Sequence, residues 1–215
     1  MVTIRIWFKK LNTAKYISHL DLCKCMERAI HRAKLPFWYS EGFNPHVFLT
    51  INMPISLGYT GMKECMDVKL VDENYSFDLI TQKLNKGLPA DIQIFDITYP
   101  KMKPKEMAYA CYEITLDKTE NLLETARELM ASPEIIVSKK TKKGMKDVDI
   151  KPNFEKMKIV ETDDILKFYI TLPSSNLGSI NPRLFFEVLS LKYGQKLYTQ
   201  TARLNCFNEK MEEFA

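Results

Sequence analysis

Two histidines stand among polar residues in the first part of the chain, where their chemistry would be useful together. His19 lies in the run S-H-L-D-L that starts at Ser18, and His46 ends a turn-rich run that starts at Ser40. Imidazole titrates near neutral pH, so two such rings beside a phosphate suit general acid–base chemistry on RNA. With Asp21, the same rings would also suit a metal ion. We interpret His19 and His46 as a candidate catalytic pair, expected to converge if the second run folds over the first.

These residues also have structural interpretations. Asp21 follows Ser18 by three positions, as the acid of a capping box does, and His19 borders an apolar helix stripe, where a core histidine would bond to backbone. Residues 42–45, Gly-Phe-Asn-Pro, suit a tight turn. Whether the histidines are catalytic, metal-binding or structural stays open on the sequence. Free N–H groups at a helix start favour an anion. The expected binding residues are Asp21, Ser40, Gly42 and Asn44.

The net charge of +4 is unevenly distributed. Five lysines fall close together, at positions 139, 140, 142, 143 and 146. A cluster of this kind suits phosphate, although a solvated hairpin tip has the same composition. Two arginines on the polar face of the first predicted helix add to it. We expect weak, salt-dependent RNA binding through Arg28, Arg32, Lys139, Lys140, Lys142 and Lys143.

The elements that would position these residues follow one order twice: strand, helix, strand, strand, helix, strand. In the first part, strands are expected at 3–10, 37–39 with 47–53, 63–71 and 92–97, and helices at 18–34 and 76–86. In the second part, strands are expected at 109–116, 135–138, 165–172 and 196–206, and helices at 120–131 and 182–193. This order is that of the ferredoxin-like unit. The predicted fold is α+β, with two tandem ferredoxin-like (βαββαβ) domains and antiparallel sheets.

A linker separates the two parts. Residues 100–105 read Pro-Lys-Met-Lys-Pro-Lys, which favours an extended connection. We therefore place one domain at residues 1–100, carrying both histidine blocks. The second domain covers residues 108–215 and includes the lysine-rich insertion. Each domain is expected to have its own four-stranded sheet.

The cysteines and the absent motifs exclude several classes of function. The five cysteines are scattered, and without a C-x-x-C pair they offer no cradle for an iron–sulfur cluster and no secreted disulfide framework. There is no P-loop, G-x-G-x-x-G, G-x-S-x-G or H-E-x-x-H. We therefore expect no cofactor and no resident metal. No apolar run reaches the roughly 18 residues of a membrane helix, and the N-terminus lacks signal-peptide character, so a cytoplasmic protein is expected.

The two histidine blocks carry a resemblance to a known family. S-H-L-D-L at 18–22 and Y-S-E-G-F-N-P-H at 39–46 resemble the radical-SAM-linked protein family of bacteria, a domain of unknown function. I-S-L-G at 55–58 and D-V-D-I-K-P at 147–152 also fit, and the resemblance spans most of the chain. Family members often continue the second block with proline and lysine, where this chain has Val47 and Phe48, so no lysine is expected to hold phosphate there.

The resemblance implies a partner rather than a radical enzyme, because companions of radical SAM enzymes are encoded beside them or fused to them. The sequence therefore predicts an accessory protein that binds a radical SAM enzyme and presents or binds RNA. An RNA-processing endoribonuclease using His19 and His46 is the alternative, by fold-level analogy with repeat-associated RNA-processing proteins of CRISPR systems. The aromatic RNA-recognition signature is absent. A third class, an enzyme acting on a small molecule, is not selected by any spacing.

Overall fold

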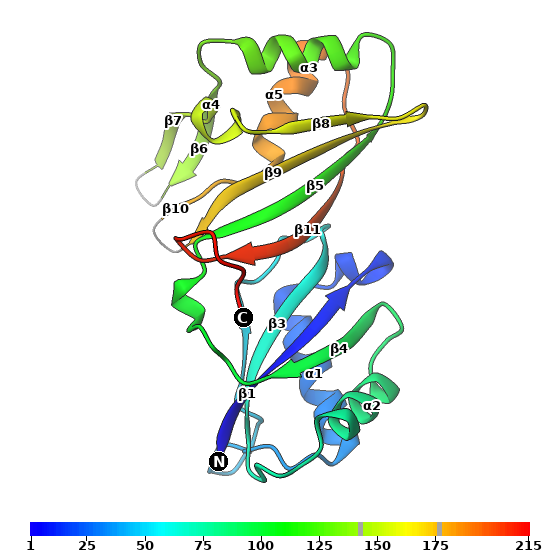
Figure 1. Cartoon of the computed structure of the whole chain (residues 1–215), viewed down its shortest axis with the longest axis vertical. Helices are drawn as coiled ribbons and strands as arrows, with labels where there is room; N and C mark the ends of the chain where they lie inside the picture. Colours follow the sequence, from blue (N-terminus) through cyan, green and yellow to red (C-terminus); the bar gives the residue numbers. More distant parts are fainter. Residues whose placement is uncertain (142–143, 176–177) are drawn as a thin grey trace.

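The computed structural model describes residues 1–141, 144–175 and 178–215. Lys142 and Lys143 of the predicted basic cluster lie outside the described residues, as does the side chain of Lys140. The described part is an α+β protein with five α-helices and a mostly antiparallel sheet. Two halves follow each other along the longest axis of the molecule, with the N-terminus at one far end and the C-terminus near the junction (Figure 1).

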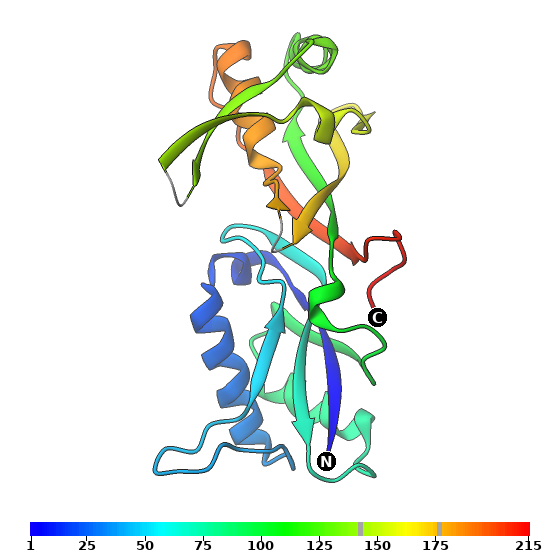
Figure 2. The ribbon, with the colours of Figure 1, turned by 90° about the vertical axis from the view of Figure 1, so that its left-hand side faces the viewer.

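The first half pairs four strands and covers one face of them with helices. Its elements are β1 (Val2–Lys10), α1 (His19–Ala33), β2 (Leu49–Asn52), β3 (Thr60–Leu70), α2 (Phe77–Gly87) and β4 (Ile92–Thr98). The strand order is β4-β1-β3-β2, and every pair is antiparallel. The helices α1 and α2 lie against the strands of this half (Figure 2). Alternation along β1 sends Ile4, Ile6 and Phe8 into the core on the helix side, and sends Arg5 and Trp7 to the opposite, open face.

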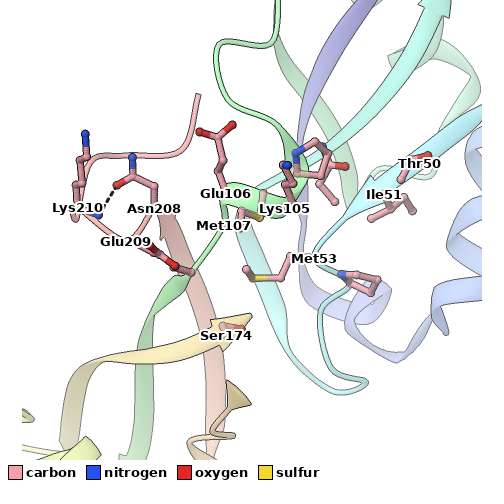
Figure 3. A pocket seen from close by; sticks show the side chains of 14 residues that line it. Thr50, Ile51, Met53, Lys105, Glu106, Met107, Ser174, Asn208, Glu209 and Lys210 are labelled. Carbon is pink, nitrogen blue, oxygen red and sulfur yellow. Dashed lines mark hydrogen bonds between the residues drawn. The ribbon is translucent and has the colours of Figure 1, made fainter. Parts of the chain in front are cut away.

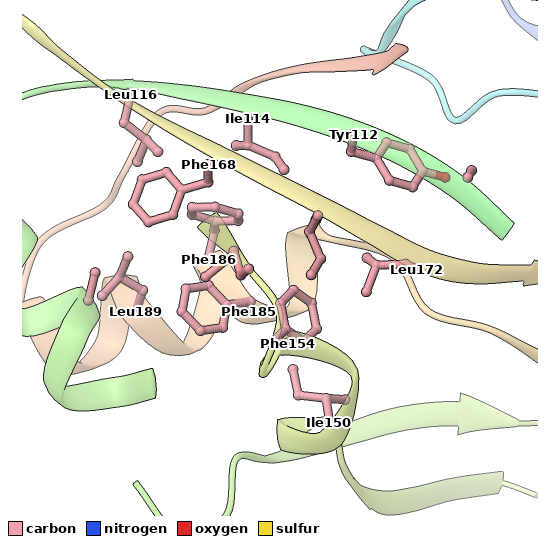
Figure 4. Packing of buried hydrophobic residues seen from close by; sticks show 14 of the residues in the cluster. Tyr112, Ile114, Leu116, Ile150, Phe154, Phe168, Leu172, Phe185, Phe186 and Leu189 are labelled. Carbon is pink, nitrogen blue, oxygen red and sulfur yellow. The ribbon is translucent and has the colours of Figure 1, made fainter. Parts of the chain in front are cut away.

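The second half uses the same pairing order with extra elements inserted. Its elements are β5 (Tyr109–Asp117), α3 (Leu122–Ala131), β6 (Ile136–Thr141), β7 (Gly144–Asp149), α4 (Lys151–Phe154), β8 (Lys158–Glu161), β9 (Ile165–Ser175), β10 (Gly178–Ser179), α5 (Arg183–Tyr193) and β11 (Gln200–Phe207). The order is β11-β5-β9-β8, again antiparallel. Its core is aromatic: Phe154 stacks on Phe185 at 5.1 Å between ring centroids, and Phe168 meets Phe186 edge-on (Figure 4).

The strand predicted at 135–138 forms, as β6, but outside the expected sheet, whereas the strand predicted at 37–39 does not form. The predicted strand at 135–138 does not enter the main sheet, because β6 pairs with β7 in a separate two-stranded sheet. β7 is the next strand in the sequence, and pairing with a near neighbour costs less chain entropy than pairing with a distant strand. The place beside β9 is taken by β8, whose four residues are too short for a periodic pattern. Residues 37–39 form only isolated bridges, Phe37 to Leu70 and Tyr39 to Val47.

The expectation of two separate four-stranded sheets is also wrong. Ala202 and Arg203 of β11 pair in parallel with Thr60 and Gly61 of β3, so the main sheet has nine strands in the described chain. The start of β3 extends beyond the end of β2, whose last pair is Asn52 with Cys65, and β11 occupies the edge that is left. The division into domains at residues 1–100 and 108–215 stays a prediction.

A buried ion pair fastens this junction. Arg203 of β11 donates from Nε to Glu64 Oε1 on β3 at 2.9 Å, and a second hydrogen bond joins Nη2 to Oε2. Both side chains are almost fully buried, at 3% and 1% exposed. Lys10 Nζ lies nearby and donates to the carbonyl of Ile17 at 3.0 Å. A Cβ on Gly61 would lie 2.5 Å from Glu64 Cγ, so only glycine leaves room for this carboxylate.

The centre of the first half's open face is covered by the chain itself. The C-terminal tail, residues 208–215, and the linker, residues 99–108, both cross it. Arg5 pairs with Asp67 and donates to the carbonyls of Ala215 at 2.8 Å and Met102 at 2.9 Å. Phe214 meets Trp7 edge-on at 6.4 Å. The two halves are therefore coupled through one hydrophobic cluster that includes Trp7 as well as the core of the second half.

Candidate functional site

The first histidine block forms a capped helix start. Ser18 Oγ accepts from the Asp21 backbone N–H at 3.2 Å, which confirms Ser18 as the N-cap, and it donates to Asp21 Oδ2 at 2.7 Å. The Asp21 carboxylate thus bonds to the Ser18 hydroxyl. His19 is exposed, which excludes a core histidine, and its Nε2 lies 3.9 Å from Cys23 Sγ. A cavity of only about 10 Å³ lies between His19 and the buried Lys10 and Glu64, too small to hold more than one water molecule.

The second block forms a closed loop, residues 40–46. The Ser40 N–H donates to the His46 carbonyl at 2.9 Å, and the His46 N–H donates to Ser40 Oγ at 3.1 Å. His46 Nδ1 lies 3.0 Å from the same Oγ and 3.4 Å from the Asn44 carbonyl. Gly42 has φ +123°, a conformation that favours glycine, so the turn interpretation of this residue is confirmed. The loop exposes Phe43 completely, at 106% of its reference area.

The predicted convergence of His19 and His46 is wrong. His31, near the end of α1, packs on Tyr39 at 5.0 Å between ring centroids, so the second block lies beside the end of the helix and not its start. From His19 to His31 the helix rises about 18 Å. Side-chain motion cannot join the two imidazoles on one bound atom. Ser40 lies with His46, and Asp21 with His19, so the cluster is divided between two sites.

The predicted basic residues are partly engaged in structure. Arg32 Nη2 donates to the Gly87 carbonyl at 2.6 Å and thereby ties α1 to the end of α2. Lys139 Nζ donates to the Ser179 carbonyl at 2.5 Å. Arg28 lies exposed on α1. Arg28 and Arg32 belong to α1 in the first half, and Lys139 belongs to β6 in the second half. RNA binding through these residues stays a prediction.

A different set of residues forms the chemically distinctive surface, and the sequence analysis missed it. On the open face of the first half, Lys69 Nζ lies 5.0 Å from the Trp38 ring centroid and 5.3 Å from that of Phe48. On the other side of the covered centre, Lys9 Nζ lies 5.9 Å from the ring of Phe95. We call these five residues the lysine–aromatic face. Phe48 is 49% exposed and Phe95 43% exposed, so both rings are accessible.

The sequence holds a signal for this face, the aromatic residues at 37–39, where the pattern predicts a strand. Trp38 lies in the Phe37-Trp38-Tyr39 run, and Phe48 follows the second block. The Phe48 N–H donates to the Trp38 carbonyl, and the Trp38 N–H donates to the Lys69 carbonyl at 2.9 Å. These bonds bring three sequence-distant side chains to one face. Only Phe37 of the aromatic run is buried.

A cavity of about 810 Å³ opens on the same face, between the halves (Figure 3). Its walls come from residues 50–54 at the end of β2, residues 104–108 of the linker, Ser174 of β9, and residues 208–210 of the tail. Its volume falls within the range of small-molecule sites. It is far larger than the cavity of about 10 Å³ beside His19.

The buried thiols near the junction are unsuited to nucleophilic chemistry. Burial raises the pKa of Cys65 to about 12 and that of Cys206 to about 11, so neither forms a thiolate near neutral pH. Within residues 1–141, 144–175 and 178–215, no three His, Cys, Asp or Glu side chains gather as metal ligands. No helix of this described part has the length and apolar character to cross a membrane.

Residues 3–182 match the family model described as "Uncharacterized protein conserved in bacteria (DUF2344)". The chain belongs to this family. No curated protein matches it. A solved structure described as an unknown protein from Galdieria sulphuraria aligns over 94% of this chain and 98% of its own, with 8% identity and a TM-score of 0.29. That likeness is too weak to bear on fold or function. A link of this chain to radical SAM enzymes stays a prediction.

Proposed function

We propose that this chain is a binding protein that holds single-stranded RNA on its lysine–aromatic face and presents it to a partner enzyme. The observation that supports this is the placement of Lys69 over both Trp38 and Phe48 beside an exposed ring face. Every base has a π-face, so aromatic platforms bind single strands with little sequence preference, at about 1–3 kcal/mol per stacked base. A lysine beside the rings supplies charge for the neighbouring phosphate.

We infer that each half is a ferredoxin-like unit. The pairing orders β4-β1-β3-β2 and β11-β5-β9-β8, both antiparallel with helices on one face, support this. RNA-recognition modules likewise stack bases on aromatic side chains of a four-stranded sheet. That parallel is an analogy of architecture, and the chemistry of the face carries the proposal.

The test is a titration of labelled single-stranded RNA with the full chain, followed by fluorescence anisotropy. Phe48→Ala is expected to weaken binding by about tenfold or more, in line with 1–3 kcal/mol per base. Tyr198→Ala is the matched control, because Lys196 Nζ lies 5.1 Å from the exposed Tyr198 ring in the second half. Lys69→Gln should lower the salt slope by about 0.7, and Lys196→Gln should not.

Two outcomes would contradict the proposal. One is the absence of RNA binding at low salt by the unchanged chain. The other is an equal loss of affinity in Phe48→Ala and Tyr198→Ala, because the location of the rings would then not matter. The arrangement does not favour the endoribonuclease alternative, because His19 lies at the start of α1 and His46 lies beside its end.

We propose, from the resemblance of the two blocks, that the partner is a radical SAM enzyme. The observation that favours a docking role is Phe43, a fully exposed ring on a loop closed by hydrogen bonds between Ser40 and His46. A pull-down from native cells should recover a protein with a three-cysteine cluster motif, and Phe43→Ser should lose it. Leu191→Ser, at an apolar side chain that is 82% exposed on α5, is the control. Recovery that is the same with Phe43→Ser would remove the loop from the interface.

A further inference from the structure

The cavity between the halves contains a buried amide with an unmet hydrogen bond. Asn52 is 3% exposed and lines the cavity from the end of β2. Its Nδ2 lies 3.6 Å from Cys65 Sγ, and its Oδ1 has no partner among the described residues. Turning the amide over does not help: a thiol can donate or accept, so one end of Asn52 stays unpaired either way. A buried polar atom without a partner is rare and points to a group that the cavity receives.

The walls on either side of this amide are apolar and adaptable. Met53 follows Asn52, and Met107 reaches the cavity from the linker; Figure 3 shows both thioethers in the space between β2 and the linker. Met53 is held by Cys206, whose Sγ donates to Met53 Sδ at 3.9 Å. Methionine sulfur makes favourable contacts with aromatic rings and fills irregular space around them. A flat ring between Met53 and Met107 would therefore be well packed.

The charges at the cavity argue against a simple anion. Lys105 and Lys210 line it, but so do Glu106 and Glu209, so the charged groups balance. Glu106 Oε2 is already engaged, since it accepts from the Lys103 N–H at 2.6 Å. A neutral planar ring with a polar edge suits this environment better than a phosphate group.

We infer that the cavity accepts a nucleobase, with the Asn52 amide on its hydrogen-bonding edge and the ring between the two methionines. An asparagine amide presents one donor and one acceptor, the pair that complements the edge of a base. The base can come from a free nucleoside or from an RNA strand. Phe48 and Asn52 lie on the same side of β2, about 13 Å apart at 3.3 Å per residue, so a strand stacked on Phe48 can reach the cavity.

The test measures binding of adenosine, guanosine, cytidine and uridine, each alone, to the full chain by calorimetry, with ribose as the sugar control. Asn52→Leu keeps the size of the side chain and removes the amide, and at least one nucleoside should lose tenfold or more in affinity. Because Asn52 is buried, a second variant protects the test against misfolding. Lys105→Trp obstructs the cavity from the exposed linker and should have the same effect, whereas Lys101→Trp, at an exposed linker lysine outside the cavity, should have none.

A second experiment uses RNA and rests on the proposed function. It distinguishes a free nucleoside from an RNA strand as the source of the base. If no free nucleoside binds, an oligonucleotide with one abasic position should bind less tightly than the intact strand, and Asn52→Leu should erase that difference. That result supports a strand as the source. If no free nucleoside binds and the abasic position does not weaken RNA binding, the inference is overturned. In that case RNA binding that still depends on Phe48 would leave the proposed function standing, while loss of RNA binding altogether would remove the function separately.

Discussion

The two halves pair their strands in the same order but differ in how they treat their open faces. In the first half, Arg5 and Trp7 point away from the helices and are nonetheless buried, because the C-terminal tail lies over them. In the second half, the corresponding face stays accessible, and its ion pair of Glu113 with Lys167 is 24% and 32% exposed. The same pairing order thus yields one face covered at its centre and one left bare.

This difference between the two open faces indicates where a binding site can form. The tail and linker cover the centre of the first half's face and so create both a wall of the cavity and a rim on which Lys69 and Phe48 remain open. The first half also depends on the second half for the covering of Arg5, because the tail that covers it follows β11.

The largest expected effect is a difference in stability between variants of the buried ion pair at the junction and variants of the exposed ion pair. Arg203→Met leaves Glu64 as an unpaired buried charge and is expected to lower the free energy of unfolding by about 3–5 kcal/mol, measured by urea denaturation. Lys167→Met, at the exposed pair, should cost less than about 1 kcal/mol. The double variant Glu64→Leu with Arg203→Met should recover most of the loss. Equal losses at the two pairs would erase the contrast between the junction and the bare face.

The next effect concerns the tail. Phe214 is 1% exposed and its ring lies 4.3 Å from Arg5 Cζ, so Phe214→Ala should lower the free energy of unfolding by about 3 kcal/mol. Val160→Ala, at an exposed position of β8 in the second half, should change it by less than about 0.5 kcal/mol. Thermal and urea unfolding give both values. A negligible change in Phe214→Ala would show that the tail does not stabilise the face it covers.

The third effect is a dependence on alkaline pH. Burial raises the folded-state pKa of Cys65 to about 12 and of Cys206 to about 11, above the value of 9.0 for a free thiol. The folded state then holds these protons more tightly, so the stability is complete below pH 9 and falls as pH rises from 9 toward 11 and 12. At pH 10 each thiol should lower the free energy of unfolding by about 1.4 kcal/mol relative to its value below pH 9.

Comparison of variants isolates this effect, because Lys10 acts in the opposite direction: burial lowers its pKa, although Glu64 opposes the shift. Cys65→Val should flatten the decline between pH 8 and pH 10 relative to the unchanged chain, followed by urea denaturation at each pH. Cys111→Val, at a half-buried position on the bare face, is the control. A slope that Cys65→Val leaves unchanged would count against a protonated, buried thiol at the junction.

The smallest effect tests whether the first histidine block does more than begin a helix. Ser18 and Ser76 cap α1 and α2 in the same way, accepting from the N–H three residues later at 3.2 and 3.3 Å. Ser18→Ala and Ser76→Ala should each lower the free energy of unfolding by about 1 kcal/mol. Neither should change RNA affinity at a temperature where both variants are folded. A loss of affinity confined to Ser18→Ala would return the first block to the binding site.

Local patterns determined much of the architecture. The Ser18 cap, the apolar stripe of Leu22, Met26 and Ala29, and the stop at Pro36 predict α1 within one residue at each end, because capping and helical periodicity depend on neighbours in sequence. The alternation in β1 and β5 is read from sequence in the same way. Family membership also follows from the sequence, since residues 3–182 match the family model.

Only the tertiary structure decided which of these local pieces meet. Arg203 finds Glu64 across 139 positions, and no local pattern encodes that pairing. His19 and His46 are residue types suited to general acid–base chemistry, but the chain places His19 at the start of α1 and His46 beside its end. Trp38, Phe48 and Lys69 are distant in sequence, and backbone hydrogen bonds between their segments bring them to one surface. The physical reason is that helix capping, turn formation and side-chain periodicity depend on a few neighbouring residues, whereas a site forms where packing brings distant segments together.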